Sequence, residues 1–252
     1  MRYRPDRHRL PPFETDGILL VDKPKDWTSF DVVNFLRSRF NIPKIGHCGT
    51  LDPAATGLLV IVFGRFTKLS QKLSGEDKKY NATILLGTVT DSGDLDGKII
   101  AKNDTSAITE EQLRKTISTF VGESMQKPPM ASAIKVDGKR LYELARKGIE
   151  IEREAKPIRI ESIEIQRMEL PECDIAVHCS KGTYIRTLAE DIGKAIGCGA
   201  TLKGLRRTAS GHFLLSEAIP LETLKTWEQV ELADYLDKVM GKTILQLANG
   251  GQ

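Results

Sequence analysis

The sequence has few of the residues that mark secreted, membrane-bound or metal-binding proteins. Its 252 residues include four cysteines and four histidines, and the cysteines form no C-x-x-C pair and no zinc-type spacing. We therefore expect reduced thiols, a cytoplasmic location and no metal ion. No apolar run is long enough to span a bilayer and no secretory signal is evident, so we also expect no membrane contact.

The net charge is small as well. Lysine and arginine number 37 against 34 acidic residues, a balance of +3 that neither requires nor excludes a nucleic-acid partner. The chain shows no internal repeat and no Ser- or Gly-rich linker. Predicted strands and helices alternate without a strict β-α-β rhythm, which favours an α+β fold around one sheet.

The most patterned stretch is Gly46–Gly57, with the sequence GHCGTLDPAATG. Its glycines allow tight turns, and Pro53 restrains the backbone of Asp52 toward an extended conformation. The apolar run Leu58–Phe63 that follows has the length of a buried strand. A carboxylate on a loop anchored by a rigid element is a candidate for catalysis. A purely structural turn around the Asp-Pro pair is the alternative interpretation.

Periodicity predicts the main elements around this loop. Residues 17–21, 78–86, 158–165 and 174–179 read as strands, with a bulge expected between Ile160 and Ile163. Thr28 or Ser29 is expected to cap one helix, and Thr109 a second, whose core stripe is predicted to include Phe120 and Val121. Further helices are expected after Thr183, ending at Gly197, and in the tail from Pro220.

The acidic loop 91–97 resembles a calcium loop only superficially. Ser92 occupies the first ligand position, and Asn103 stands where the bidentate glutamate belongs. We therefore predict no metal site there.

Residues 127–156 differ in character from the rest of the chain. After Lys127-Pro128-Pro129, basic residues surround an Asp137-Gly138 turn and Tyr142. Interleaved basic and aromatic residues favour an RNA-facing element, although a solvated surface helix would have a similar composition. The adjacent pair Arg206 and Arg207 is counted with the RNA-binding charges.

Six segments in this order resemble the bacterial tRNA pseudouridine-55 synthases, the TruB family. They are GILLVDKPKDWTS (17–29), GHCGTLDPAATGLL (46–59), KKYNATILLGTVTDSGDLDG (78–97), PPMASAIKVDGKRLYELARKG (128–148), CSKGTYIRTLAEDIG (179–193) and LRRT (205–208). The likeness covers about residues 17–220. It implies a mixed, largely antiparallel central sheet with flanking helices and an inserted RNA-gripping thumb.

The resemblance also implies roles for single residues, with no cofactor. Asp52 would be the catalytic aspartate, Arg186 its partner, and Tyr80 the aromatic that stacks on the flipped uracil. The substrate-binding set would include His47, Tyr184, Leu205 and Lys23, the last in a motif that braces the loop of Asp52. The thumb residues expected to bind RNA are Lys135, Lys139, Arg140 and Arg146.

The organisation expected from this likeness is a flexible basic arm (1–16), a catalytic domain (17–220) with the thumb at about 127–154, and a short helical tail (221–252). The tail is too short for the RNA-binding module that the family usually carries at its C-terminus. Ala131 also departs from the family, which often has an aromatic residue at this position. The expected substrate is the T-arm stem-loop of tRNA, bound by a monomer without guide RNA.

Two alternatives remain open. A tRNA-binding folding factor with little catalytic activity would share the RNA-binding features, but Asp52, Tyr80 and Arg186 are all present. A guide-dependent enzyme of the archaeal or eukaryotic kind is less favoured, because the chain has no room for the module that holds guide and partners. Assays of pseudouridine formation with and without guide RNA separate these possibilities.

Overall fold

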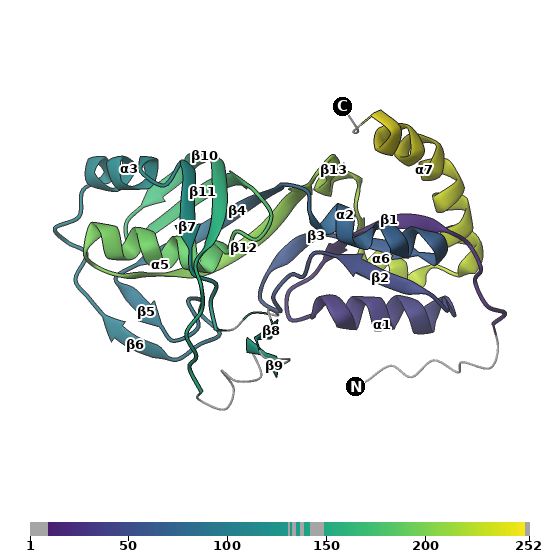
Figure 1. Cartoon of the computed structure of the whole chain (residues 1–252), viewed down its shortest axis with the longest axis horizontal. Helices are drawn as coiled ribbons and strands as arrows, with labels where there is room; N and C mark the ends of the chain where they lie inside the picture. Colours follow the sequence, from purple (N-terminus) through teal and green to yellow (C-terminus); the bar gives the residue numbers. More distant parts are fainter. Residues whose placement is uncertain (1–9, 131, 133–134, 137–138, 142–148, 250–252) are drawn as a thin grey trace. The chain divides into compact units, whose positions relative to one another are not determined.

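The structure is a computed structural model that describes residues 10–130, 132, 135–136, 139–141 and 149–249. The chain divides into two compact units (Figure 1). The first unit combines Met1–Lys78 with Arg206–Gln252, and the second consists of Lys79–Leu205. The chain passes between them within two strands, β4 (Lys78–Leu86) and β12 (Ala200–Ser210). Each unit is described by itself below.

The first unit is a sheet with helices against it. Its strands are β1 (Gly17–Lys23), β2 (Ile45–Cys48), β3 (Thr56–Phe63), the second half of β12, β13 (Phe213–Leu214) and β14 (Ile219–Pro220). Its helices are α1 (Ser29–Arg39), α2 (Ser70–Ser74), α6 (Leu221–Thr226) and α7 (Gln229–Asn249), with 3-10 turns at Gly64–Leu69 and Leu215–Glu217. Helices α1 and α2 contact β2, whereas α6 and α7 contact β1.

Strand β3 is the centre of this unit. It pairs with β1 along one edge, and its other edge is shared by β12 near Thr56 and Gly57 and by β2 from Val60 onward. Leu58–Phe63 are all 0% exposed, as the apolar run predicted. Each such side chain contributes about 1.5–3 kcal/mol when fully buried, so the strand is a rigid base for the loop before it.

One local prediction in this unit is wrong, and another is confirmed for one of its two candidate residues. The loop was expected to begin at Gly46, but Gly46, His47 and Cys48 belong to strand β2 and pair with β3. The loop between strands is therefore the shorter segment 49–55. Thr28 is the cap of α1, in a reciprocal capping box with Asp31. Ser29 is buried and has a different partner, described below.

The second unit has a sheet in the order β12-β4-β11-β10-β7, formed with the first half of β12. The other strands are β11 (Glu172–Cys179), β10 (Lys156–Glu169) and β7 (Gly122–Gln126), and two hairpins are formed by β5 (Thr88–Thr90) with β6 (Ile99–Lys102) and β8 (Lys135–Val136) with β9 (Lys139–Arg140). Its described helices are α3 (Glu110–Ser118) and α5 (Ile185–Ile196). The expected bulge in β10 is confirmed by a register shift between Ile160 and Ser162.

The two faces of this sheet differ because side chains alternate along each strand. One face is apolar: Ile84 and Ile175 pack in one core with Leu113 and Ile117 of α3 and Leu188 of α5. Figure 1 shows both helices beside the strands of this unit. Phe120 packs against the core as predicted, but Val121 is 46% exposed because the helix has already ended at Ser118.

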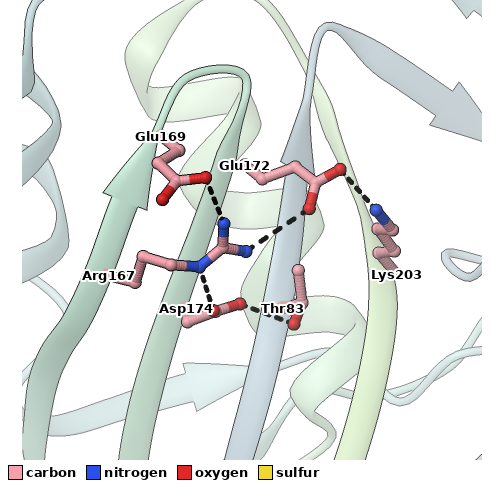
Figure 2. A network of polar contacts seen from close by, with 6 residues as sticks. All are labelled: Thr83, Arg167, Glu169, Glu172, Asp174 and Lys203. Carbon is pink, nitrogen blue, oxygen red and sulfur yellow. Dashed lines mark hydrogen bonds and ion pairs between the residues drawn. The ribbon is translucent and has the colours of Figure 1, made fainter.

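The residues that alternate with these apolar ones point to the opposite face of the sheet, and several of them are charged (Figure 2). Arg167 Nε lies 2.7 Å from Asp174 Oδ2, and its other nitrogens bind Glu169 at 2.5 Å and Glu172 at 3.5 Å. Thr83 and Lys203 extend the network to β4 and β12. Hydrogen bonds from Arg167 lower the pKa of Asp174, so the network favours the ionised carboxylate. It links four neighbouring strands.

The predicted fold class is confirmed: the protein is α+β, with mixed, largely antiparallel pairing and flanking helices. Strand β12 was not predicted, although it pairs with strands of both units. Among the described helices, none is both long and apolar enough to cross a lipid bilayer.

Candidate active site

The loop 49–55 leaves β2 and returns into β3. Asp52 lies at its middle, half-buried, and the Ala55 N–H donates to the Asp52 carbonyl at 3.1 Å in a tight turn. The Asp26 N–H donates to the Pro53 carbonyl at 2.9 Å, from a residue with a left-handed φ of 66°. Asp52 therefore stands on a loop whose backbone is bonded both internally and to the segment after β1.

Ser29 fixes the residue before Asp52. Its buried hydroxyl accepts from the Leu51 N–H at 2.8 Å and donates to the Leu51 carbonyl at 3.1 Å. Leu51 itself is buried. The Ser29 side chain thus satisfies both backbone groups of Leu51, which restricts the backbone conformation of the loop directly before Asp52.

Lys23 fixes the residue after Asp52. Its side chain is fully buried, and Nζ donates to the carbonyls of Trp27 at 2.6 Å, Pro24 at 2.9 Å and Pro53 at 3.3 Å. Burial lowers the pKa of Lys23 to about 8, against the opposing attraction of the Asp52 and Asp26 carboxylates. Lys23 thus connects the segment after β1 with the residue that follows Asp52.

Arg207 holds both ends of the loop. Its side chain is buried, with Nε donating to the Leu58 carbonyl at 2.7 Å and Nη2 to the Gly49 carbonyl at 3.1 Å. The prediction that Arg207 offers its charge to RNA is therefore wrong, because only 1% of the residue is exposed. Arg206 is more accessible and pairs with Asp22 at 2.7 Å.

Gly57 is required where the loop enters β3. Its φ is +99°, and a Cβ atom at this position would lie 2.4 Å from the carbonyl oxygen of Arg207. No other residue type fits both the conformation and this approach of the two backbones.

His47 lies on β2, half-buried. Burial and, to a smaller extent, the positive charge of Arg207 lower the pKa of its imidazole. Nδ1 has no hydrogen-bond partner among the described residues. A neutral ring next to the loop can donate or accept a hydrogen bond toward a bound molecule.

The second unit contributes a different group of predicted residues, centred on Arg186 of α5. Its side chain is 5% exposed, Nη1 donates to the Ser92 carbonyl at 3.0 Å, and Nε lies 3.6 Å from Asp94 Oδ2. Asp94 is itself held by the Ser92 hydroxyl at 2.5 Å. The acidic loop that resembles a calcium site therefore positions an arginine.

Gly93 lets this loop approach α5. Its φ is +76°, and an added Cβ would lie 2.7 Å from the Glu190 carboxylate and 3.4 Å from Cβ of Arg186. The Leu202 N–H also donates to the Gly93 carbonyl, at 2.9 Å.

The remaining predicted pocket residues also belong to the second unit. Tyr80 lies on β4 and Leu205 on the neighbouring strand β12, and both pack half-buried against the core of the unit. Tyr184 is the N-cap residue of α5, two positions before Arg186. The structure thus places Tyr80, Tyr184, Arg186 and Leu205 in one unit, and Asp52, His47 and Lys23 in the other.

The predicted thumb residues lie largely beyond what the structure describes. The backbones of Lys135, Lys139 and Arg140 form the β8–β9 hairpin, but their side chains are not described. Arg146 and Ala131 lie outside the described residues.

Sequence reasoning missed the residues that support the site. Ser29 was considered only as a helix cap, Asp94 only as part of a rejected metal loop, and Arg207 only as a surface charge. For Asp94 the only local signal was the cluster of three aspartates in residues 91–97, which does not by itself identify a partner.

Comparison with known proteins identifies the family. The N-terminal domain of the TruB family of pseudouridylate synthases matches residues 37–185, and the C-terminal domain of tRNA pseudouridylate synthase B matches residues 186–241. A tRNA pseudouridine synthase B of Opitutus terrae is 50% identical over 85% of this chain and 89% of its own length. Its counterpart in Endomicrobium trichonymphae is 45% identical over 91% and 96%.

A solved structure shares the fold at lower identity. The crystal structure of a Cbf5-Nop10-Gar1 complex contains a chain that is 30% identical, with a TM-score of 0.65. The match covers 82% of this chain but about half of that one, 52%. With two family domains matched in sequence and relatives of 45–50% identity along most of its length, the chain belongs to the TruB family of pseudouridylate synthases.

Proposed function

We propose that this enzyme isomerises uridine 55 in the T-loop of tRNA to pseudouridine, with Asp52 acting on the ribose of a flipped-out nucleotide. Family membership supports the reaction class, and the names of the relatives support tRNA as substrate. One observation carries the role of Asp52: Ser29 holds the residue before it and Lys23 the residue after it. A carboxylate held in this way is preorganised for reaction.

The reaction needs no oxidant and no added group. The bond between C1′ and N1 of the uridine breaks, the uracil rotates, and a bond forms between C1′ and C5. C5 then loses its proton and N1 gains one, so atoms balance within the nucleotide. Attack by the Asp52 carboxylate on the sugar and removal of a sugar proton both use an ionised oxygen.

The target base leaves its stack before it reacts. Loss of stacking costs a few kcal/mol, and an aromatic side chain such as Tyr80 recovers about 1–3 kcal/mol of it. Tyr184 and Leu205 complete the surface around the base. Arg186, which is always charged, pairs with Asp52 in the reacting complex and favours its ionised form.

RNA recognition falls on the T-arm. His47 contacts the stem-loop near the target, while the thumb residues Lys135, Lys139, Arg140 and Arg146 contact phosphates. A structured loop with a base that splays out is a feature that proteins commonly read in RNA. Each phosphate contact adds about 0.7–0.9 to the slope of log K against log salt.

The test is modification of an unmodified tRNA transcript by purified protein alone, without guide RNA. Tritium released from C5-labelled uridine measures turnover, and chemical mapping locates the pseudouridine. We expect one modified site, and no release when the T-loop uridine is replaced by cytidine. Modification at another position, or only after a guide RNA is added, would contradict the proposal.

A further inference from the structure

The side chain of Gln126 is bonded to the backbone of Tyr184. The side-chain oxygen of Gln126 accepts from the Tyr184 N–H at 2.8 Å, and its Nε2 donates to the Tyr184 carbonyl at 3.1 Å. Gln126 is 5% exposed, so both bonds are shielded from water. The amide matches both backbone groups of one residue at once, a pairing that few side chains offer.

Tyr184 is the point at which α5 begins. Its backbone is extended, with φ −100° and ψ 112°, and its own side chain caps nothing. Its carbonyl accepts the first helical bond, from the Leu188 N–H at 3.0 Å, as well as the bond from Gln126. Gln126 therefore fixes the start of the helix that carries Arg186 two residues later.

Gln126 also lies at the root of the segment 127–154. It is the last residue of β7 and directly precedes Lys127-Pro128-Pro129, where that segment leaves the sheet. In the β7–β10 pairing its register partner is Lys156, the first residue of β10 after the segment returns. Both ends of the segment thus meet at Gln126.

Beyond Gln126, residues of this root and of α5 line a common pocket. The pocket has a volume of about 410 Å³, and its lining includes Lys127, Pro128 and Arg153 from the root and Thr187, Glu190 and Lys194 from α5. The two buried bonds of Gln126 connect the root directly with the start of α5, next to the residues that line this pocket.

We propose that Gln126 is a positioning residue, which sets Tyr184 and Arg186 in register with the root of the RNA-gripping segment. This inference rests on the proposed function. The side chain of Gln126 joins the root of the segment to the start of α5. RNA bound by the segment and the uracil bound next to Tyr184 and Arg186 then occupy a fixed relative position. In this role Gln126 acts through the backbone of Tyr184 and not through contact with the reacting nucleotide.

Gln126→Ala removes both bonds, whereas Gln126→Glu keeps the shape and one acceptor but places a carboxylate oxygen against the Tyr184 carbonyl. A misplacement of about 1 Å costs up to a hundredfold in rate. We expect the single-turnover rate of pseudouridine formation to fall about 10- to 100-fold in both variants, with Kd for tRNA within about twofold of the wild type.

The matched control is Gln112→Ala. Gln112 caps α3 of the same unit by accepting from the Thr109 N–H at 3.0 Å, and α3 carries no predicted site residue. This variant should lower the melting temperature and leave the rate unchanged.

Three results would overturn the inference. Weaker tRNA binding at an unchanged rate would make Gln126 an RNA contact, and a change in melting temperature alone, or failure of both variants to fold, would make it only structural. An inactive wild-type protein would instead refute the proposed function.

Discussion

The buried side chain of Arg207 offers a quantitative test of how the loop of Asp52 is held. Arg207→Met keeps most of the buried volume but removes the donors to Gly49 and Leu58. Each hydrogen bond from a charged group contributes about 1.5–3 kcal/mol, and a buried carbonyl left without a partner costs about 1–3 kcal/mol. Relief of the buried charge offsets part of the loss.

We therefore expect the free energy of unfolding to fall by about 4 kcal/mol. For a chain of this size, 1 kcal/mol corresponds to about 2–4 °C, so the melting temperature should fall by about 8–16 °C. The rate should fall as well, even at temperatures where the variant is folded, because the two ends of the loop lose their common anchor. Thermal unfolding and single-turnover kinetics at 20 °C measure the two effects.

Arg206→Met is the matched control. Arg206 is the neighbouring residue on β12, its side chain is 43% exposed, and it pairs with the carboxylate of Asp22. Pairs of this kind contribute about 0–1 kcal/mol, so the control should melt within about 4 °C of the wild type. If Arg207→Met melts and reacts like the control, Arg207 does not anchor the loop.

Three further predictions concern pH, geometry and substrate. Because the pKa of folded Lys23 is about 8 against an ordinary 10.5, the unfolded chain keeps a proton that the folded chain has released between these pH values, so stability rises with pH. Relative to Lys23→Met, wild-type stability should gain up to about 1.4 kcal/mol per pH unit in denaturant titrations between pH 8 and 10, and parallel curves would contradict this. Arg186→Lys keeps the charge but cannot span Ser92 and Asp94, so turnover should fall far more than tRNA binding; equal losses would indicate a phosphate contact. An isolated T-arm hairpin should be modified about as efficiently as full tRNA, and a large preference for full tRNA that disappears without residues 1–16 would show that the arm binds substrate.

The sequence predicted well those elements whose apolar pattern is long. Leu58–Phe63 forms one fully buried strand, and α5 ends at Gly197, which has the left-handed φ of 94° expected at that position. Short or mixed elements were missed. Strand β2 has four residues including a glycine, and β12 carries Arg206 and Arg207 in adjacent positions, so neither shows the alternation that marks a half-buried strand.

The site was predictable only where a residue stands in a recognisable motif. Asp52 and Arg186 stand in recognisable motifs, whereas Ser29, Gln126 and Arg207 act through contacts with residues 22 to 158 positions away. Such contacts are set by tertiary packing and leave no local periodicity. The buried charge of Arg207 is the clearest case, because composition alone predicts that an arginine is exposed.

The central claim is that Asp52 performs the chemistry on a loop built to hold it. Its most direct test is the single-turnover rate of Asp52→Asn on unmodified tRNA, with Asp96→Asn as a control for an exposed aspartate. We predict no detectable pseudouridine with Asp52→Asn, unchanged tRNA binding and melting temperature, and a wild-type rate for the control. Pseudouridine formation by Asp52→Asn at a rate near that of the wild type would contradict the account.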